Sequence, residues 1–418
     1  MSSLIIRPKG PLYGSVRISG SKNAALPILA ATLLSEKPCT IFDVPPLSDT
    51  ANMLGILRKL GSSIRHTGKD SFAITNDNIK KPEAEYEDTG RLRASFLIAG
   101  PLLAKYQKCR IALPGGCKIG SRPIDLHLKG FSSLGAAVSI NHGIVELCAP
   151  RLRGASIYLD FPSVGATENI MMAATLADGI TVIENAAVEP EITDLANFLN
   201  RMGACVRGAG TDTVKITGVP FLNGTVHTII PDRIEAGTFM VAAAISGGRI
   251  KLENVVPEHL KPLSAKMREM GISVLESDTS ILTEAAEELF PTDIKTLPFP
   301  GFPTDMQSQL CALMSVSHGT SIITETVFEN RFMHVEELKR MGADITIEGR
   351  AAIVKGKPHL MGTKVTATDL RAGAALVLAG LCAEGETHIG DAEHIFRGYA
   401  NFEEKLRNLG ADIEKAPI

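Results

Sequence analysis

Residues 369–380 read DLRAGAALVLAG, a short polar start followed by positions that are apolar nearly all round. A surface helix would keep one polar face, so this segment is predicted to be a buried helix. Five other segments share the pattern: NAALPILAATLLS (23–35), RASFLIAGPLLA (93–104), ATENIMMAATLA (166–177), EAGTFMVAAAIS (235–246) and DMQSQLCALMSV (305–316). β-Branched runs such as CTIFDV and ITVIENA follow these segments and predict strands. Each buried helix is therefore expected to be wrapped by its own sheet.

A second, amphipathic helix accompanies each buried one and ends on an apolar residue followed by glycine. Examples are DTANMLGILRKLG (49–61) and NFEEKLRNLG (401–410), with glycine at the position where helices stop. The pair recurs every 68 to 74 residues, at Leu60-Gly61, Leu134-Gly135, Met202-Gly203, Met270-Gly271, Met341-Gly342 and Leu409-Gly410. This period predicts six copies of one α/β unit. Three copies per domain would give two domains of ordinary size, with a crossing near Pro231-Asp232.

Composition excludes several classes of protein. The chain has 418 residues, 44% of them hydrophobic, and a formal net charge of −3, so nothing attracts it overall to nucleic acid or membrane. The start of the chain lacks a signal-peptide pattern, and no apolar run approaches the ~20 residues of a membrane span, so a cytoplasmic enzyme is expected. The seven scattered cysteines form no CxxC pair, which argues against disulfides and structural zinc.

Cations cluster at the predicted starts of four buried helices: Lys22, Arg93, Arg233 and Arg371. The other two buried helices are predicted to start at Thr167-Glu168 and Thr304-Asp305. Asp, Thr and Asn at such places are ordinary caps, but a cation at the positive end of a helix dipole costs roughly 0.3–1 kcal/mol. A compensating anion is therefore expected, and a bound phosphate or carboxylate would supply it. Lys118, Arg122, Arg331 and Arg397 stand in connecting segments. Each alone is an ordinary solvated charge, but together they favour one convergent site for phosphate or carboxylate.

Three further residues are candidates for a role in the chemistry. Cys117, in PGGCKIGSRP (114–123), lies beside Lys118 and Arg122, which could lower its pKa and make it reactive. Asp305 is a helix cap or a general base, and capping is favoured when the residue is taken alone. His127, in DLHL, contacts a substrate or is a packed core histidine, and the sequence does not separate these possibilities.

The chain resembles the enolpyruvyl transferase family over essentially its whole length, in particular the UDP-N-acetylglucosamine 1-carboxyvinyltransferases. The strings that carry the resemblance are GSKNAALP (20–27), LPGGCKIGSRPIDLH (113–127), PSVGATENIM (162–171), FPTDMQSQ (302–309), TETVFENRFMHV (324–335), ATDLRAGAALVLAG (367–380) and HIFRGY (394–399). The resemblance implies a two-domain inside-out α/β barrel with three pseudo-symmetric repeats per domain. One domain is expected to hold residues 1–20 and 231–418 with phosphoenolpyruvate and catalytic contributions, and the other residues 21–230 with a mobile Cys117 loop.

The resemblance also implies a reaction. An enolpyruvyl group passes from phosphoenolpyruvate to the 3′-hydroxyl of UDP-N-acetylglucosamine by addition and elimination, phosphate is released, and neither a metal nor a cofactor is needed. Small-molecule substrates are the only partners expected, and the oligomeric state is left open. This is the first committed step of peptidoglycan precursor synthesis.

Site roles follow from the same resemblance. Phosphoenolpyruvate is expected to contact Lys22, Asn23, Arg93, Cys117, Arg122, Arg331, Arg371 and Arg397. The nucleotide sugar is expected to contact Asn23, Arg93, Arg122, Pro123, Ile124, Asp125, Leu126, His127, Ser163, Val164, Gly165, Thr304, Asp305 and Val327. Asp305 matches the proposed base, Asp369 lies beside the reaction centre, and Lys22 and Arg397 take part in catalysis. Cys117 matches a loop cysteine that adds to phosphoenolpyruvate, aids proton transfer or product release, and is alkylated by fosfomycin in sensitive members.

Two departures and two rivals complete the sequence interpretation. Ser48 and Phe161 replace lysines that some members carry, so diphosphate contacts are expected to be redistributed. A 5-enolpyruvylshikimate-3-phosphate synthase would share the fold, but the Cys117 loop and the GATEN and ENRFMH strings fit the nucleotide-sugar enzyme better. A sensor without turnover would keep the fold and bind the nucleotide sugar but would release no phosphate.

Overall fold

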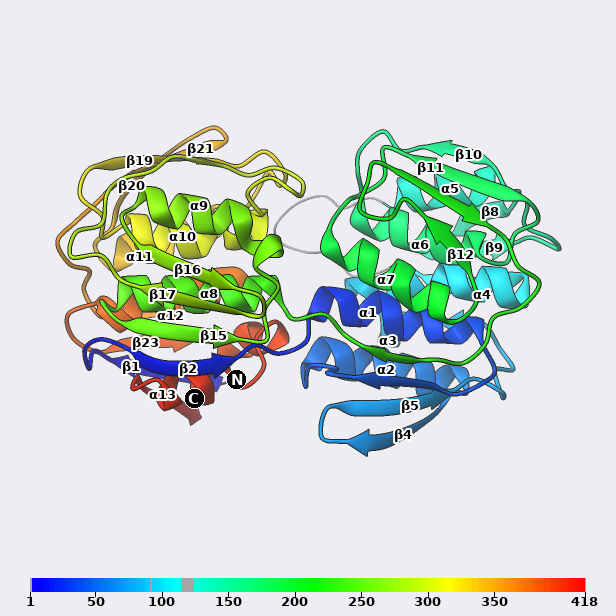
Figure 1. Ribbon diagram of the computed structural model, residues 1–418, viewed down its shortest axis with the longest axis horizontal. Helices are drawn as coiled ribbons and strands as arrows, with labels where there is room; N and C mark the ends of the chain where they lie inside the picture. Colours follow the sequence, from blue (N-terminus) through cyan, green and yellow to red (C-terminus); the bar gives the residue numbers. More distant parts are fainter. Residues whose placement is uncertain (1, 91, 114–123, 418) are drawn as a thin grey trace. The chain divides into compact units, whose positions relative to one another are not determined.

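The computed structural model describes residues 2–90, 92–113 and 124–417. The chain divides into two compact units. Unit 1 comprises the described residues up to Ser19 and from Pro231 onward, and unit 2 comprises those from Gly20 to Ile230. Each unit has its own hydrophobic core. Figure 1 shows both units with their helices and strands labelled.

Unit 1 contains three four-stranded sheets in its described part, with strand orders β16-β17-β15-β2, β18-β19-β21-β20 and β22-β23-β1-β24. The strands are β1 (Ser2–Arg7), β2 (Tyr13–Arg17), β15 (Arg249–Glu253), β16 (Ser273–Ser277), β17 (Ser280–Glu284), β18 (Ile294–Lys295), β19 (Thr320–Thr324), β20 (Asp344–Glu348), β21 (Ala351–Lys355), β22 (Lys364–Thr366), β23 (Thr387–Gly390) and β24 (Asp412–Pro417). Strand β1 lies between β23 and β24, and β2 pairs with β15. The two ends of the sequence therefore belong to one unit.

Unit 2 repeats the arrangement with the orders β14-β3-β5-β4, β6-β7-β9-β8 and β10-β11-β13-β12. Its strands are β3 (Cys39–Phe42), β4 (Ser63–Gly68), β5 (Ser71–Thr75), β6 (Glu83–Ala84), β7 (Lys108–Ala112), β8 (Ala137–Asn141), β9 (Ile144–Cys148), β10 (Ser156–Tyr158), β11 (Ile180–Glu184), β12 (Cys205–Arg207), β13 (Thr213–Thr217) and β14 (Val226–Thr228). Every sheet of the two units has one parallel pair at an edge, such as β10 with β11, and two antiparallel pairs. This shared order is the structural form of the sixfold repeat.

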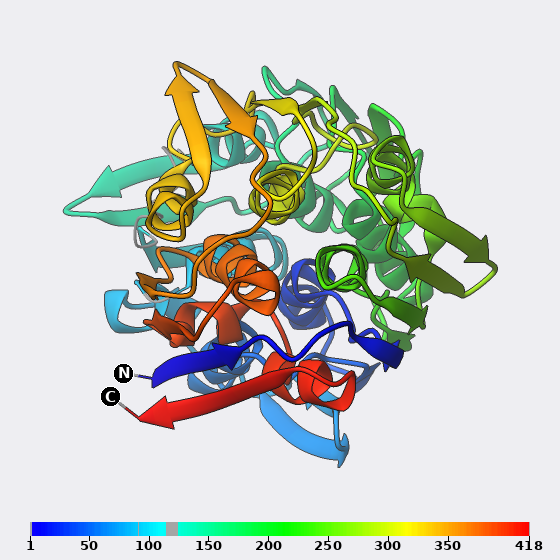
Figure 2. The same cartoon turned by 90° about the vertical axis from the view of Figure 1, so that its left-hand side faces the viewer.

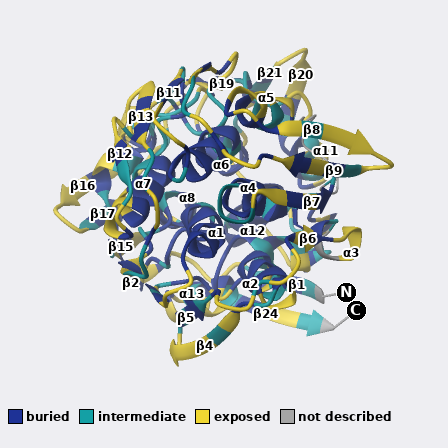
Figure 3. Cartoon of the chain, turned by 90° about the vertical axis from the view of Figure 1, so that its right-hand side faces the viewer, coloured by how far each residue is buried: buried dark blue, intermediate teal, exposed yellow. Residues whose placement is uncertain are grey.

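Each unit encloses three apolar helices. In unit 1 these are α8 (Arg233–Ile245), α10 (Gln307–Met314) after the 3₁₀ turn η4 (Thr304–Met306), and α12 (Leu370–Cys382). In unit 2 they are α1 (Lys22–Ala31) with η1 (Thr32–Leu34), α4 (Ala99–Tyr106) after η2 (Arg93–Ile98), and α6 (Val164–Ala174). Figure 2 looks down the unit 1 helices, and Figure 3 shows those of unit 2 buried inside more exposed strands. The predicted buried helices are confirmed, and the sheets around them stay six separate open sheets.

The outer helices end as predicted, each against a glycine. They are α2 (Ser48–Leu60), α5 (Asp125–Ser133), α7 (Pro190–Arg201), α9 (Lys261–Glu269), α11 (Met333–Arg340) and α13 (Phe402–Asn408). The six glycines of the repeat have positive φ angles: Gly61 116°, Gly135 93°, Gly203 103°, Gly271 89°, Gly342 91° and Gly410 108°. Only glycine adopts this conformation without steric cost, so the recurring glycine ends each helix.

Three details differ from the sequence expectation. Helix α6 begins one turn earlier than the Thr167-Glu168 start that the pattern suggested, because Ser163 is its cap. The predicted helix at 93–104 begins as the 3₁₀ helix η2 and becomes α-helical only at Ala99. Short helices α3 (Tyr86–Thr89), η3 (Pro257–Leu260) and η5 (Ala392–Arg397) were not anticipated. No helix in the described ranges is both long and apolar enough to span a membrane.

Candidate functional site

Four of the six central helices, α1, α6, α8 and α12, are capped by side chains. Ser21 accepts a hydrogen bond from the Ala24 amide at the start of α1, and Ser163 accepts one from the Ala166 amide at the start of α6. In unit 1, Asp232 and Asp369 are the caps of α8 and α12. The helices that begin as η2 and η4 have no side-chain cap, so side-chain capping occurs in four of the six repeats.

The first charged cluster lies in unit 1 around Asp305. Its Oδ1 accepts a hydrogen bond from Arg331 Nη2 at 2.6 Å, and its Oδ2 accepts one from Arg371 Nη2 at 3.0 Å. Arg331 and Arg371 are 6% and 3% exposed, while Asp305 is 27% exposed. Asp305 lies within η4, and Pro303 occupies the cap position of that turn. The interpretation of Asp305 as a cap is therefore wrong, and the residue is the shared counter-ion of two guanidinium groups.

A buried glutamate supports this cluster from the side. Arg331 Nη1 donates to Thr304 Oγ1 at 3.1 Å, and Thr304 donates to Glu325 Oε2 at 2.8 Å. Glu325 Oε1 accepts hydrogen bonds from the amides of Val327 and Phe328. Thr304, Asp305, Arg331 and Arg371 are thus brought together, and Val327 joins them through Glu325. Sequence reasoning missed Glu325, although the residue lies within TETVFENRFMHV.

Arg371 is fixed on its other side by an aromatic ring. Its guanidinium carbon lies 5.2 Å from the centroid of Tyr399, a cation–π distance. The Tyr399 hydroxyl is 2.9 Å from Thr238 Oγ1 and accepts a hydrogen bond from Gln309 Nε2 at 3.0 Å. Burial opposes the charge of Arg371, but Tyr399 and the Asp305 carboxylate raise its pKa above the ordinary value. The side chain therefore stays a cation inside the core.

The other predicted residues of unit 1 lie on neighbouring elements. The Asp369 carboxylate accepts hydrogen bonds from the amides of Arg371 and Ala372 at 2.8 and 3.0 Å. Nearby His334 on α11 is buried, and burial lowers its pKa to about 4, an effect that Asp369 opposes. Arg397 ends η5, which packs against α12. The Arg233 guanidinium at the start of α8 lies 5.5 Å from the Phe299 ring centroid.

In unit 2, Lys22 has a protein carboxylate beside it. Its Nζ lies 3.4 Å from Asp49 Oδ2 on α2, and both side chains are buried. Lys22 beside Asp49 and Arg371 beside Asp305 therefore both have internal counter-ions. The helix-dipole argument alone does not require a bound anion at these two helices. Asn23 follows Lys22 on α1.

His127 is the best-defined polar group of unit 2. It lies on α5, its Nδ1 is 3.0 Å from Asn169 Nδ2, and its ring meets Phe96 edge-on at 5.3 Å between centroids. Burial and then the Arg93 cation lower the pKa of His127 to about 3, although part of the ring is exposed. Ile124 precedes α5, and Asp125 and Leu126 begin it. The start of α6 beside it is formed by Ser163, Val164 and Gly165. His127 is thus a neutral imidazole at the meeting point of two helix starts.

Part of the predicted site lies outside the described residues. Cys117, Lys118, Arg122 and Pro123 fall in the range 114–123. Ser48 and Phe161, the two departures from the family pattern, are both exposed. Arg93 begins η2, and its cation acts on His127.

A group of acidic side chains was not anticipated. Glu168 on α6 is 3% exposed, and burial followed by the charges of Glu191 and Glu189 raises its pKa well above the ordinary value. Its Oε1 has no hydrogen-bond partner among the residues that the structure describes. Sequence reasoning took Glu168 as part of a helix start, whereas it lies in the second turn of α6.

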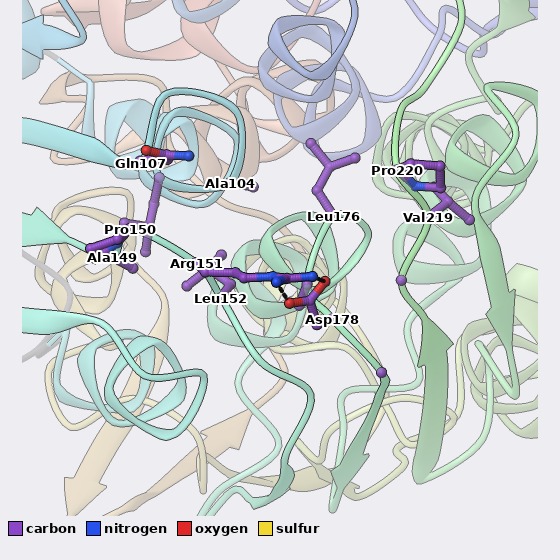
Figure 4. Close-up of a pocket in the computed structure, with 14 residues that line it drawn as sticks. Ala104, Gln107, Ala149, Pro150, Arg151, Leu152, Leu176, Asp178, Val219 and Pro220 are labelled. Carbon is purple, nitrogen blue, oxygen red and sulfur yellow. Dashed lines mark hydrogen bonds and ion pairs between the residues drawn. The ribbon is translucent and has the colours of Figure 1, made fainter.

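A cavity of about 400 Å³ opens in unit 2 at the other end of the central helices. Leu103 and Ala104 of α4, and Leu176 just beyond α6, line it, and an Arg151–Asp178 ion pair crosses it in Figure 4. None of the predicted site residues in the described ranges lines this cavity. No group of three metal-ligating side chains occurs in the described ranges either. The predicted site residues in these ranges lie instead at helix starts and in the Asp305 cluster.

The chain is similar to known proteins over nearly its whole length. Residues 6–406 match the family described as EPSP synthase (3-phosphoshikimate 1-carboxyvinyltransferase). The UDP-N-acetylglucosamine 1-carboxyvinyltransferase 1 of Caldanaerobacter subterraneus is 57% identical over 413 residues, which cover 99% of both chains. The enzyme of that name from Halalkalibacterium halodurans is 57% identical over 417 residues, covering 99% of this chain and 94% of that one.

Solved structures are similar along the whole chain. The enolpyruvyl transferase NikO from Streptomyces tendae has a TM-score of 0.90 at 27% identity, with 100% of both chains covered. An EPSP synthase from Acinetobacter baumannii has a TM-score of 0.79 at 18% identity and shares the fold. Because the family match spans nearly the whole sequence and relatives share more than half of its residues, the chain belongs to the EPSP synthase family of enolpyruvyl transferases.

Proposed function

We propose that the chain is a UDP-N-acetylglucosamine 1-carboxyvinyltransferase, which transfers the enolpyruvyl group of phosphoenolpyruvate to the 3′-hydroxyl of UDP-N-acetylglucosamine and releases phosphate. The identity of 55–57% to four enzymes of that name, over 99% of this chain, supports the acceptor. The single structural observation that carries the proposal is the Arg331–Asp305–Arg371 cluster. It joins two buried guanidinium groups, which suit phosphate and carboxylate, to one carboxylate that can act as a base.

The proposed reaction has two steps. The 3′-oxygen attacks C2 of phosphoenolpyruvate while C3 gains a proton and becomes a methyl group, and Asp305 takes the hydroxyl proton. The resulting tetrahedral ketal then loses a proton from that methyl group and expels phosphate, which restores the double bond. Charge on the phosphate and carboxylate is balanced by Lys22, Arg93, Arg122, Arg331, Arg371 and Arg397 in this proposal.

The cluster also suggests how substrate binding prepares the base. Both oxygens of Asp305 accept hydrogen bonds from arginine. An anionic substrate competes with Asp305 for the same guanidinium forks, because Arg binds phosphate and carboxylate alike. In this proposal, binding of phosphoenolpyruvate draws Arg331 and Arg371 away from Asp305 and leaves its carboxylate free for the hydroxyl proton.

The remaining roles complete the proposed site. Cys117 serves proton transfer or product release and reacts with fosfomycin. Asp369 positions the start of α12 beside the reaction centre. The nucleotide sugar is held by the starts of α1, α5 and α6, which carry Asn23, His127 and Ser163.

The test is an assay with two acceptors. Purified protein is mixed with phosphoenolpyruvate and either UDP-N-acetylglucosamine or shikimate-3-phosphate, and phosphate release and product mass are measured. Phosphate release with an enolpyruvyl mass gain on the nucleotide sugar alone is expected. Turnover of shikimate-3-phosphate instead would show that the chain is an EPSP synthase. Binding of the nucleotide sugar with no turnover of either acceptor would indicate a sensor.

A further inference from the structure

The side-chain amide of Asn169 sits at the junction of three helices of unit 2. It is fully buried on α6, where its Oδ1 accepts a hydrogen bond from the Gly100 amide at 2.7 Å and its Nδ2 donates to the Phe96 carbonyl at 2.8 Å. A Cβ on Gly100 would come within 2.7 Å of Oδ1, so glycine is needed for this approach. The amide is thus fixed by two backbone groups.

These two backbone bonds determine which end of the amide faces His127. The Gly100 amide can only donate and the Phe96 carbonyl can only accept, so Oδ1 and Nδ2 cannot be exchanged. The atom that lies 3.0 Å from His127 Nδ1 is therefore the donor Nδ2, whose second hydrogen points to the ring. His127 Nδ1 must then be the acceptor, and the neutral imidazole carries its hydrogen on Nε2.

The other side of the ring faces the start of α6. A Cβ built on Gly165 would lie 3.2 Å from His127 Cε1 and 3.4 Å from Nε2. No hydrogen bond joins Nε2 to any residue in the described ranges. An uncharged N–H donor therefore stands next to the helix start that Ser163 caps. Protonation of the ring is disfavoured here. A hydrogen on Nδ1 would point at the Nδ2 hydrogens of Asn169, and the charge of Arg93 would repel the imidazolium.

We propose that Asn169 is a positioning residue that holds His127 in the Nε2–H tautomer, so that His127 donates a hydrogen bond to an acceptor oxygen of the nucleotide sugar. The ligand part of this inference rests on the proposed function, whereas the tautomer rests on the hydrogen bonds of Asn169 alone. Asn169 acts through His127 and does not itself touch the substrate.

The test replaces Asn169 by its acidic isostere. In Asn169→Asp a carboxylate faces Nδ1, which favours a hydrogen on Nδ1 and removes the enforced Nε2–H tautomer. Protein labelled with ¹⁵N-histidine is studied by NMR at pH 7.5, and His127→Gln identifies the His127 signals. The wild type is expected to show the neutral Nε2–H form and Asn169→Asp the Nδ1–H or doubly protonated form. The Kd for UDP-N-acetylglucosamine, measured by calorimetry, is expected to rise about tenfold.

Asn76→Asp is the matched control. Asn76 is an equally buried amide of unit 2 that donates to the backbone carbonyl of Thr32 and lies outside the site. The Asn76→Asp protein should lose stability, but its Kd for UDP-N-acetylglucosamine should stay within about twofold of the wild-type value. An Nδ1–H tautomer in the wild type, or an equal loss of affinity in Asn76→Asp, would overturn the inference.

A second pair of variants covers the case in which Asn169→Asp does not fold. The amide nitrogen of His127→Gln can replace Nε2–H, whereas that of His127→Asn can only reach the position of Nδ1. Glutamine is expected to retain more affinity than asparagine, and the reverse order would contradict the inference. If the wild type does not bind UDP-N-acetylglucosamine, both the proposed function and the ligand part of this inference are wrong. The NMR result would still decide which tautomer His127 adopts.

Discussion

The Asp305 cluster of unit 1 and Glu168 of unit 2 show two different ways of burying ionisable groups. In unit 1 the cations Arg331 and Arg371 share the carboxylate of Asp305. In unit 2 the carboxyl of Glu168 is buried near two further acids, and its pKa is raised well above the ordinary value. A guanidinium cannot lose its proton, so the fold must supply a counter-charge. A carboxyl can be buried by keeping its proton, and it then needs no partner ion.

The largest expected effect comes from removing the shared counter-charge. Asp305→Asn should lower turnover at least about hundredfold, because the proposed base is lost, while UDP-N-acetylglucosamine binding remains. Stability should fall by about 1–3 kcal/mol, because two buried guanidinium groups lose their ion pair. Steady-state kinetics, calorimetry and urea unfolding measure the three quantities.

Asp194→Asn is the control for Asp305→Asn. Asp194 is buried in unit 2, where its Oδ1 lies 3.0 Å from His227 Nε2, and it has no role in the proposed reaction. This variant should lose stability without losing turnover. Near-normal turnover in Asp305→Asn would exclude Asp305 as the base.

Glu168→Gln tests whether Glu168 of unit 2 is buried in its protonated form. Glu168 ionises near 4.5 in the unfolded chain and well above that value in the fold, so unfolding releases a proton between these two pKa values. The free energy of unfolding therefore falls as pH rises through this window, by about 1.4 kcal/mol per pH unit for one proton. Glutamine has the shape of the protonated acid and does not ionise. The difference in stability between variant and wild type should grow in favour of Glu168→Gln from pH 5 to 7, as measured by urea unfolding. A constant difference would show that Glu168 is ionised in the fold.

Substitution of the two aspartate caps of unit 1 distinguishes the loss of helix capping from the loss of a role in the reaction. The Asp232 and Asp369 Oδ1 atoms accept from two amides each, at 2.8 and 3.0 Å in both helices. Replacement of either residue by alanine should cost about 1–2 kcal/mol of unfolding free energy. The Asp369→Ala change should also reduce kcat by a larger factor than Asp232→Ala, because in the proposed function Asp369 lies beside the reaction centre. Equal kinetic effects would reduce Asp369 to a cap.

The smallest effect is expected at the glycines that end the outer helices. Gly203 of unit 2 and Gly410 of unit 1 have φ angles of 103° and 108°, and a Cβ at either would meet nothing within 4 Å. Alanine should therefore cost about 1 kcal/mol at both positions, through backbone strain alone. Thermal unfolding of Gly203→Ala and Gly410→Ala would show whether the two units respond alike, and a markedly larger loss in one unit would break the equivalence of the repeats.

Two predictions about helix starts were wrong, and both had been made from the local sequence alone. Asp305 looked like a cap because it precedes a helix, yet its partners Arg331 and Arg371 lie 26 and 66 residues away. Thr167-Glu168 looked like a helix start because the apolar run begins there, yet Ser163 caps α6 one turn earlier. The first error arises because the partners of Asp305 are distant in sequence, and the second because α6 includes residues that precede its apolar run.

The sequence by itself determined the repeat, the six buried helices and the glycines that end their companions. These features depend on local physics: the apolar circumference of a helix, and the one residue that tolerates a positive φ. The tertiary structure alone decided that Asp305 neutralises two arginines, that Asp49 lies beside Lys22, and that Asn169 sets the tautomer of His127. Each of these contacts joins residues far apart in the chain, and only the packing of helices around a common core brings them within hydrogen-bonding or ion-pairing distance.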